Sequence, residues 1–458
     1  MSKYQVVNPA TGEVVEEYPT ATDAQITDAL ERSHQAYASW RETPIEERTK
    51  VLARVAEIYN ERSEELAKII QLEMGKAVPE GQGEIALVGL IYNYFADNAK
   101  AFIEEEKLKG PKNAEAYILR RPVGSLLGIM PWNFPYYQVA RFAAPNLALG
   151  NTIILKHAPQ CPKSAAVMEQ IFQDAGLPAD AYINVYATNE QVSDVILPDP
   201  RNQGVSLTGS ERAGSAVAAA AGKNLKKVVL ELGGSDPYIL LDSPDLDATV
   251  KTFFGTRMGN TGQACNSPKR MIVMDDMYDE FVEKLTAVAK EATPEDPTAE
   301  GSKLSPLSSL AAKERFMEQV QATIADGATI HAGEGDYDTP GAFVKPVVLT
   351  DVKPGKRGYH EELFGPAFMV FKASSEEEAI ELANDTPFGL GSAVFSADVD
   401  KAAKVGSQID AGMVFINSPE QSREFLPFGG VKRSGVGREL GPLAMDEFCN
   451  KQLFYKQQ

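Results

Sequence analysis

The stretch that decides the fold begins with Thr152-Ile153-Ile154-Leu155-Lys156 and ends with Lys227-Val228-Val229-Leu230-Glu231-Leu232. Both ends are almost continuous apolar runs, which is typical of strands buried on both faces of a sheet. Between them the sequence predicts, in order, a helix over 164–175, a strand over 183–186, a strand over 205–207 and a helix over 211–222. Repeated units of strand and helix predict an α/β fold with a mostly parallel sheet covered by helices.

The flanking sequence extends this pattern in both directions. Before it, residues 8–12 (Asn-Pro-Ala-Thr-Gly) predict a turn between two short strands, and 23–107 has helical apolar spacing. After Gly234 a second alternating set follows, with strands over 238–241, 270–274 and 367–371, helices over 277–291 and 309–325, a surface loop over 291–301 and a last strand over 448–455. We therefore expect two α/β domains and a small appendage of strands.

Size and charge exclude several classes of partner. At 458 residues the chain exceeds one ordinary core, so two or three domains are expected. It carries 45 basic and 64 acidic residues, a formal net charge of −19. Such a surface repels nucleic acid and anionic membranes, so neither is expected as a partner. An anionic substrate would then need a local cation in its pocket.

Cysteine and histidine usage points to a reducing compartment and no metal. The three cysteines, Cys161, Cys265 and Cys449, are odd in number and far apart, which predicts no disulfide framework. Four scattered histidines give no metal-ligand spacing. The N-terminus lacks a signal-peptide pattern, and no window has 18 consecutive apolar residues. The expected location is the cytoplasm.

Cys265 and Glu231 suggest covalent catalysis. Cys265 ends a loop of small residues, Gly259-Asn260-Thr261-Gly262-Gln263-Ala264-Cys265, and Glu231 lies 34 positions earlier, just before Gly233-Gly234. A thiolate on such a loop is open to attack a substrate, and a carboxylate on a glycine turn can activate water. The alternative is that Cys265 is a small buried apolar residue, as most free cysteines are.

Two features could hold a nucleotide, although no Gly-x-Gly-x-x-Gly motif follows an early strand. In Leu207-Thr208-Gly209-Ser210-Glu211 the strand ends at Gly209, and Ser210 can cap a helix whose first N–H groups face an anion. Lys156 ends a strand, where open α/β sheets place ligands. The alternatives are an ordinary strand-to-helix turn and a lysine that extends to water.

Six motifs then occur in a fixed order. They are Pro131-Trp132-Asn133-Phe134-Pro135, Leu207-Thr208-Gly209-Ser210, Glu231-Leu232-Gly233-Gly234, Gly262-Gln263-Ala264-Cys265, Glu362-Leu363-Phe364-Gly365-Pro366 and Pro427-Phe428-Gly429-Gly430-Val431-Lys432. With them the chain resembles the aldehyde dehydrogenase superfamily along nearly its whole length. The resemblance implies that Cys265 is the nucleophile and that Glu231 activates the water that hydrolyses a thioester. It also implies that Asn133 and the Cys265 N–H stabilise the oxyanion.

The resemblance further implies a nicotinamide cofactor, NADP or NAD. In this interpretation Glu362 holds the nicotinamide ribose, Lys156 the adenosine ribose and Ser210 the pyrophosphate. The other residues expected at the cofactor are Trp132, Pro159, Gly209 and Phe364, with Phe364 packing at the ring. Relatives that prefer NAD usually carry a glutamate three residues after this lysine, whereas Pro159 stands here. No carboxylate repels a 2′-phosphate, so NADP should be accepted.

The expected substrate is a small acidic aldehyde. The run from Asn133 to Pro145 resembles the succinate-semialdehyde dehydrogenase branch, in which an arginine at the position of Arg141 faces the substrate carboxylate. Ser422 matches a serine that assists it, and Arg423 could substitute for or add to that serine. Arg141 could instead form a domain-interface ion pair. Glutarate semialdehyde, or a broad range of aldehydes, is the alternative substrate, because one methylene is worth only about 1–3 kcal/mol.

The family's architecture gives the expected domains: a Rossmann-like nucleotide-binding domain over 1–110 and 128–231, an α/β catalytic domain over 232–433, and a small β arm over 111–127 and 434–458. Such an arm mediates formation of a homodimer or homotetramer. A CoA-acylating relative would generally lack Glu231, and a catalytically silent binding protein of this fold would have lost Cys265, Glu231 or Asn133; all three are present. A cysteine hydrolase would need a histidine near the thiol, and the sequence suggests none.

Overall fold

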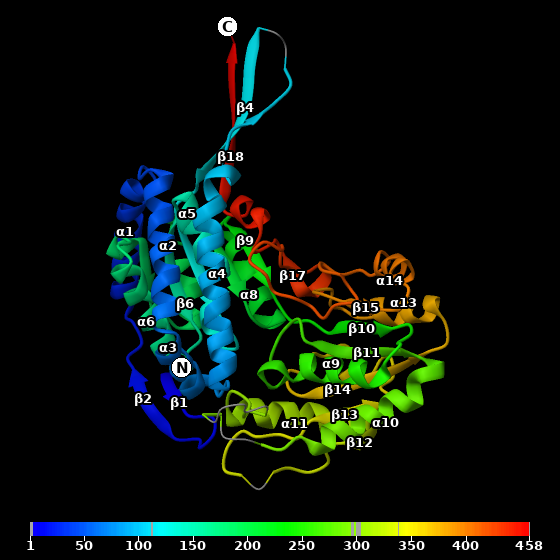
Figure 1. Ribbon diagram of the computed structural model, residues 1–458. Helices are drawn as coiled ribbons and strands as arrows, with labels where there is room; N and C mark the ends of the chain where they lie inside the picture. Colours follow the sequence, from blue (N-terminus) through cyan, green and yellow to red (C-terminus); the bar gives the residue numbers. More distant parts are fainter. Residues whose placement is uncertain (1–2, 111–112, 295–296, 299–303, 338, 458) are drawn as a thin grey trace.

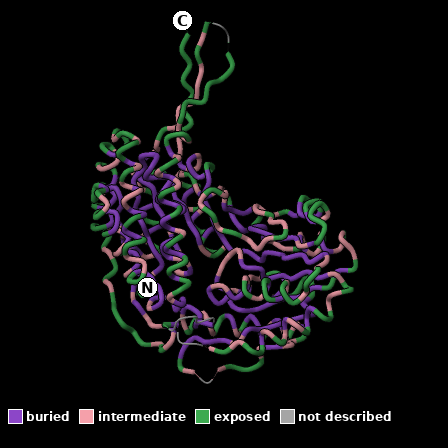
Figure 2. Tube along the Cα trace, in the orientation of Figure 1, coloured by how far each residue is buried: buried purple, intermediate pink, exposed green. Residues whose placement is uncertain are grey.

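The protein folds into two lobes and a projecting arm (Figure 1). This computed structural model describes residues 3–110, 113–294, 297–298, 304–337 and 339–457. The buried backbone lies inside the two lobes, whereas the arm is largely exposed (Figure 2). Of the loop predicted over 291–301, Glu291 is the last residue of α10, 292–294 and 297–298 are neither helix nor strand, and 295–296 and 299–301 lie outside the described residues. Within the described part of the chain, no helix is both long enough and apolar enough to cross a membrane.

The first lobe is built on a six-stranded sheet. Its strands, in spatial order, are β17 (Gly435–Val436), β9 (Lys227–Glu231), β8 (Asn202–Thr208), β5 (Ser125–Met130), β6 (Thr152–His157) and β7 (Tyr182–Asn184). All neighbours run parallel except β17, which is antiparallel to β9. The predicted parallel sheet is therefore confirmed, and it places Lys156 and Glu231 at the carboxyl ends of their strands.

Helices cover both faces of this sheet because its strands are apolar on both sides. One apolar core joins the sheet to α2 (Ile45–Glu61), α3 (Ser63–Met74), α4 (Val78–Phe102), α5 (Pro135–Leu149) and α6 (Pro162–Asp174). The other joins it to α1 (Asp23–Trp40) and α8 (Glu211–Lys223), beside the short α7 (Asn189–Gln191). Strand and helix alternate along the chain as predicted.

The second lobe has a seven-stranded sheet. Its strands, in spatial order, are β12 (Thr329–Ala332), β13 (Val347–Thr350), β14 (Ala367–Ala373), β11 (Pro268–Met274), β10 (Asp236–Leu240), β15 (Ala393–Phe395) and β16 (Phe415–Ile416). Only β12 is antiparallel to its neighbour. The helices of this lobe are α9 (Leu246–Met258), α10 (Asp275–Glu291), α11 (Leu310–Ala325), α12 (Arg357–His360), α13 (Glu376–Asn384) and α14 (Val399–Gly406).

Two smaller sheets complete the fold. β1 (Tyr4–Val7) pairs antiparallel with β2 (Val14–Tyr18) around the predicted turn, in which Gly12 has a φ of +78°. The arm consists of β18 (Cys449–Gln457), β4 (Ala114–Pro122) and β3 (Glu106–Lys107). β3 follows α4 at the end of the region predicted as helical, so that region is helical only as far as Phe102.

Candidate active site

The loop that carries Cys265 has an unusual backbone. After α9 ends, Asn260 and Thr261 both adopt left-handed φ angles, 51° and 53°, and Gly262 follows at +74°. Such a conformation is costly for residues with a side chain and persists where the surroundings hold it. Here the Asn260 N–H donates to Glu80 Oε1 at 2.9 Å, and Arg257 Nη1 donates to the Gly262 carbonyl at 2.9 Å. The loop therefore presents Cys265 from a fixed backbone.

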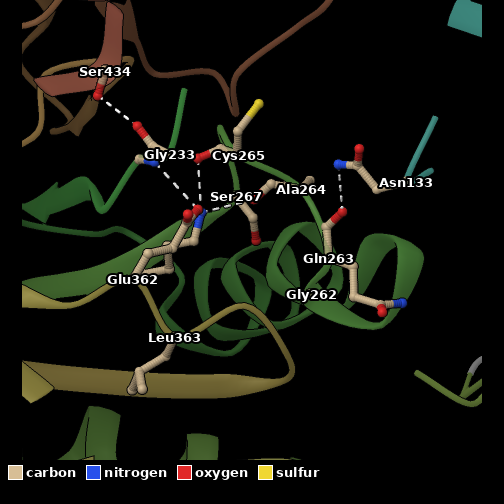
Figure 3. Close-up of polar contacts among 12 residues, drawn as sticks. Asn133, Gly233, Gly262, Gln263, Ala264, Cys265, Ser267, Glu362, Leu363 and Ser434 are labelled. Atoms are coloured by element: carbon tan, nitrogen blue, oxygen red, sulfur yellow. Dashed lines mark hydrogen bonds and ion pairs between the residues drawn. The ribbon is translucent and has the colours of Figure 1, made fainter. Parts of the chain in front are cut away.

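Asn133 lies beside this loop (Figure 3). Its Nδ2 donates to the Gln263 carbonyl at 2.9 Å, and its Oδ1 accepts from Gln138 Nε2 at 2.9 Å. Asn260 Nδ2 also donates to the Asn133 carbonyl at 2.9 Å. An amide nitrogen carries two hydrogens, so Asn133 keeps one donor after binding Gln263. The contacts of the Asn133 side chain with Gln263 and Gln138 fix the orientation of its remaining N–H next to the thiol loop.

Glu231 ends β9 with its carboxyl group fully buried. Among the described residues neither of its carboxylate oxygens has a hydrogen-bond partner. Burial raises the pKa of Glu231 well above its usual range, and Glu439 raises it further while Arg141 opposes the shift. A buried carboxyl without a partner is expensive, and such groups cluster at functional sites. At Gly234, a Cβ would lie 2.4 Å from the Cys265 carbonyl oxygen, so this glycine lets the two segments touch.

A cavity of about 210 Å³ opens onto the thiol. Its walls are mostly apolar and include Phe134, Tyr137, Phe428 and Leu87, with the polar residues Glu84, Gln138, Arg141, Cys265, Asn266 and Ser422 and with Gly83. The Arg141 guanidinium lies between two aromatic rings, 4.8 Å from the centre of Tyr137 and 4.3 Å from that of Phe428. Arg141 is thus the one basic residue among the described residues that line the cavity with the thiol.

Arg141 is also paired with a carboxylate that the sequence did not suggest. Its Nε lies 2.8 Å from Glu439 Oε2, and both side chains are buried. Burial is the largest single influence and lowers the pKa of Arg141, but Glu439, Tyr137, Glu231 and Cys265 together raise it above the ordinary value, so the guanidinium stays charged. The ion pair expected as the alternative role of Arg141 is therefore present, and Arg141 lines the cavity as well. The pairing engages the Nε edge of the guanidinium.

Burial also has the largest effect on the pKa of Cys265, a half-buried free thiol. It raises the pKa of Cys265 to about 12, while Arg141 and Lys269 oppose the shift. The resting thiol is therefore protonated at neutral pH. A base must take this proton before the sulfur can act as a nucleophile.

The residues expected at the nicotinamide end lie together. Glu362 Oε1 accepts from the Gly234 N–H at 3.2 Å and lies 2.9 Å from Lys269 Nζ. The rings of Phe364 and Trp132 meet edge to face at 5.7 Å. In Figure 3 the Cys265 sulfur points away from Glu362, so the thiol and this carboxylate face different directions.

The residues expected at the adenosine end surround the ends of β6 and β8. Lys156 is only 6% exposed, and burial, the sole cause, lowers its pKa to about 8. Ser210 Oγ caps α8 by accepting from the Ala213 N–H at 3.3 Å, and the Gly209 N–H donates to the Glu231 carbonyl at 2.9 Å. Pro159 is half-buried, and its carbonyl accepts from the Gln5 N–H at 3.0 Å. No ion pair with Lys156 occurs among the described residues, and α8 begins after β8, two strands away from β6 in the sheet, so this end of the sheet suits an anion.

The structure does not bring Arg423 to the cavity. Its side chain is exposed and donates to Gln421 Oε1 at 3.3 Å, whereas its neighbour Ser422 lines the cavity. The sequence analysis missed Glu439 and Lys269, which contact site residues. The available signal for Lys269 was that two basic residues, Lys269 and Arg270, lie at the start of a strand that is apolar from Met271 onward. No group of side chains suited to a metal ion occurs among the described residues.

Comparison with known proteins is consistent with this geometry. The model of the "Aldehyde dehydrogenase family" matches residues 1–454. A succinate-semialdehyde dehydrogenase (NADP+) of Deinococcus radiodurans is 51% identical over 450 residues, 98% of this chain and 94% of that protein. Succinate-semialdehyde dehydrogenase (NADP+) 1 of Mycobacterium tuberculosis is 40% identical over 97% of each chain. The crystal structure of a succinic semialdehyde dehydrogenase from Streptococcus pyogenes with NADP+ has a TM-score of 0.97 and 42% identity, covering 99% of this chain and 100% of that one.

Proposed function

The chain belongs to the aldehyde dehydrogenase family, and from this premise we propose that it oxidises succinate semialdehyde to succinate with NADP as its cofactor. The names of its relatives support this substrate and this cofactor. The observation that carries the proposal is the buried Arg141 guanidinium in the same cavity as the Cys265 thiol. A cavity of about 210 Å³ holds a short aldehyde and little more.

Arg141 and Ser422 are the proposed binding groups for the substrate carboxylate. A buried guanidinium binds a carboxylate strongly because little water competes and two parallel hydrogen bonds can form. Glu439 pairs with the Nε edge and Nη2 donates to Thr208 Oγ1 at 3.5 Å, which leaves Nη1 and the second hydrogen of Nη2 for the ligand. Glutarate semialdehyde is the second candidate, since one extra methylene changes binding by only about 1–3 kcal/mol.

In the proposed reaction the Cys265 sulfur attacks the aldehyde carbon and forms a thiohemiacetal. The thiol proton passes to solvent water before the attack, so the Glu231 carboxylate stays free to take a proton in the later hydrolysis. The oxyanion receives hydrogen bonds from the free N–H of the Asn133 amide and from the Cys265 backbone N–H. When bound, NADP supplies the hydride acceptor for the oxidation. The product of that oxidation is a thioester on Cys265.

Hydrolysis of the thioester needs a second base-catalysed step. Glu231 takes a proton from water, the hydroxide adds to the thioester carbon, and the carbon–sulfur bond breaks to release succinate and the thiolate. Its carboxylate has no hydrogen-bond partner among the residues described, so no protein donor competes with a water molecule for it. A CoA-acylating enzyme would need no such base, which argues against that alternative.

The residues at the cofactor end fit a phosphorylated nucleotide. Lys156 is a buried amine whose pKa is lowered by burial, and an anion such as the 2′-phosphate of NADP would compensate its charge. We assign Ser210 and Gly209 to the pyrophosphate, Glu362 to the nicotinamide ribose, and Trp132 with Phe364 to the nicotinamide side. Pro159 leaves no carboxylate to repel the 2′-phosphate, and NAD is the weaker alternative.

The remaining expectations concern the organisation of the protein. We propose that 1–110 with 128–231 binds the nucleotide, that 232–433 carries the thiol, and that 111–127 with 434–458 mediates a homodimer or homotetramer. We place the protein in the cytoplasm, because all three cysteines are free.

The test is the initial rate of nicotinamide reduction with succinate semialdehyde and with butanal. We expect a strong preference for the acidic aldehyde, and Arg141→Met should lower kcat/KM for it about 10–150-fold, as loss of a charged hydrogen bond of about 1.5–3 kcal/mol implies. Activity with butanal should change little. Equal rates of the wild type with both aldehydes would overturn the carboxylate role of Arg141, and no reduction with any aldehyde would overturn the proposed activity.

A further inference from the structure

Lys269 connects two parts of the site that lie far apart in the sequence. It is the second residue of β11, and its side chain is fully buried. Its Nζ donates to the Ala264 and Cys265 carbonyls, both at 2.7 Å, and lies 2.9 Å from Glu362 Oε1. An ammonium has three donors, so these three acceptors use all of them. The same amine thus holds the nucleophile loop and the Glu362 carboxylate.

The position of this ammonium depends on Glu362. A buried charge must be paired, and breaking a buried pair by removing one partner is strongly destabilising. Two more buried carboxyls, Asp236 and Glu420, are close enough to be affected by Lys269, but burial raises the pKa of both, that of Asp236 to about 7. They are therefore less ionised at neutral pH than ordinary carboxyls. Glu362 is the carboxylate that makes direct contact with the amine.

Glu362 is held from the other side as well. It accepts from the Gly234 N–H, and a Cβ at Gly233 would lie 2.5 Å from its Oε2. The carboxylate therefore lies against the glycine turn that follows Glu231, as Figure 3 shows for Gly233 and Glu362. A ligand that hydrogen-bonds this carboxylate acts on the same amine that fixes the Cys265 carbonyl.

We propose that Lys269 is a positioning residue that couples the Glu362 carboxylate to the backbone of the nucleophile loop, so that occupancy of the ribose site changes the exposure of the Cys265 thiol. This rests on the proposed function in that Glu362 is assigned to the nicotinamide ribose. The contrasting view is that Lys269 only neutralises buried carboxyls. In that case its removal would lower stability without linking the cofactor to the thiol.

The experiment measures alkylation of Cys265 by iodoacetamide, followed by peptide mass spectrometry so that Cys161 and Cys449 are counted separately. The proteins compared are the wild type, Lys269→Met, Glu362→Gln, the double variant, and Lys404→Met as a control at an exposed lysine. We expect NADP to change the wild-type rate at least threefold and to leave the Lys269→Met rate unchanged. The KM for NADP should rise at least fivefold in Lys269→Met, and Lys404→Met should match the wild type in both.

A double-mutant cycle without NADP gives a second readout. If Lys269 acts through Glu362, the alkylation rate of the double variant should equal that of the more affected single variant; multiplication of the two effects would overturn the proposal. This cycle needs neither aldehyde nor cofactor. Failure to oxidise succinate semialdehyde would therefore overturn the proposed function, while the coupling of Lys269 to Glu362 could still be tested. If Lys269→Met does not fold, Lys269→Arg keeps the charge with a different donor geometry, and a full wild-type NADP response in it would overturn the proposal.

Discussion

The chemistry of Lys156 is set by its burial at the end of β6. Burial lowers its pKa to about 8, so the amine is charged below pH 8 and loses its proton as the pH rises through that value. The attraction between Lys156 and the phosphate of NADP should therefore weaken as the pH rises through about 8. We expect the Kd for NADP, measured by quenching of tryptophan fluorescence, to be lowest below pH 7.5 and to rise at least tenfold by pH 9.5.

Lys156→Met provides the control for this titration. Its Kd should be higher at pH 7 and should change little with pH, because the titrating amine is gone. Binding to the wild type that stayed constant from pH 7 to pH 9.5 would show that Lys156 does not contact the anionic part of the cofactor.

Glu231 should be needed for release of the product more than for the first oxidation. In Glu231→Gln the amide cannot accept a proton from water, so the thioester on Cys265 should accumulate. Loss of a general base typically costs about 10²–10⁴-fold in rate. We expect a rapid burst of reduced nucleotide, up to one per chain, followed by slow turnover that added hydroxylamine accelerates. A steady state without a burst would instead place Glu231 in the attack step.

At the scale of elements, the left-handed turn before Cys265 should not tolerate a side chain at Gly262, whereas Gly259, three residues earlier, should tolerate one. Gly262 has a φ of +74°, and a Cβ there would lie 2.5 Å from the Gly365 carbonyl oxygen. Gly259 has a φ of −50° and open space around its Cα. Gly262→Ala should therefore lower the free energy of unfolding by at least about 1–3 kcal/mol, the cost of backbone strain, and Gly259→Ala should do so by less than about 1 kcal/mol.

Differential scanning calorimetry and the alkylation rate of Cys265 check this pair of variants. A lower unfolding temperature and altered thiol reactivity are expected only in Gly262→Ala. If both glycines tolerated alanine equally, the turn would not be the rigid support of the thiol that its contacts indicate.

The elements themselves were largely predictable, but their contacts were not. The apolar runs and their alternation with helices predicted β6 to β9 of the first sheet and β10, β11 and β14 of the second, whereas β12, β13, β15 and β16 were missed, because strands of two to four residues carry little periodicity. On α3 and α4, the exposed Glu64, Glu65 and Glu80 and the buried Glu73 and Glu84 all lie in helices. Only the fold reveals which of these carboxylates are buried.

Two carboxylates of α4, Glu80 and Glu84, support the site from behind. Glu84 accepts from the N–H groups of Tyr136 and Tyr137 at 2.9 and 3.1 Å and pairs with Lys76, which fixes the start of α5 just after Asn133. Glu80 accepts from Asn260, as described above. The motifs predicted which residues lie at the reacting centre, but a motif contains no information about a supporting residue that comes from another helix.

At the scale of the whole molecule, the site exists because the chain passes from one sheet to the other beside it. β9 of the first sheet ends at Glu231 and β10 of the second begins at Asp236, so the glycine turn between them bridges the lobes. The thiol comes from the second lobe, and Glu231, Asn133 and Arg141 come from the first. β17 then returns to pair with β9. The geometry of the site therefore depends on how the lobes pack, which no local pattern in the sequence specifies.

The arm makes a prediction about the assembly. β18 pairs with β4 over nine residues, from Cys449 opposite Pro122 to Gln457 opposite Ala114, and it forms one edge of the three-stranded sheet. Leu453 and Tyr455 on this edge strand are 63% and 53% exposed. A long exposed apolar edge strand is prone to pair with another chain, and proteins normally cover it. We expect a second copy of the chain to cover the exposed edge of β18.

Light scattering after size-exclusion chromatography tests this expectation. The wild type should have at least twice the chain mass of 49.7 kDa, and Leu453→Lys with Tyr455→Lys should shift it to a smaller species by placing two charges on the edge. Leu225→Lys serves as the control, because Leu225 is 94% exposed on the turn between α8 and β9 and should not alter the mass. A monomeric wild type, or an unchanged mass in the double variant, would show that the arm does not hold the assembly together.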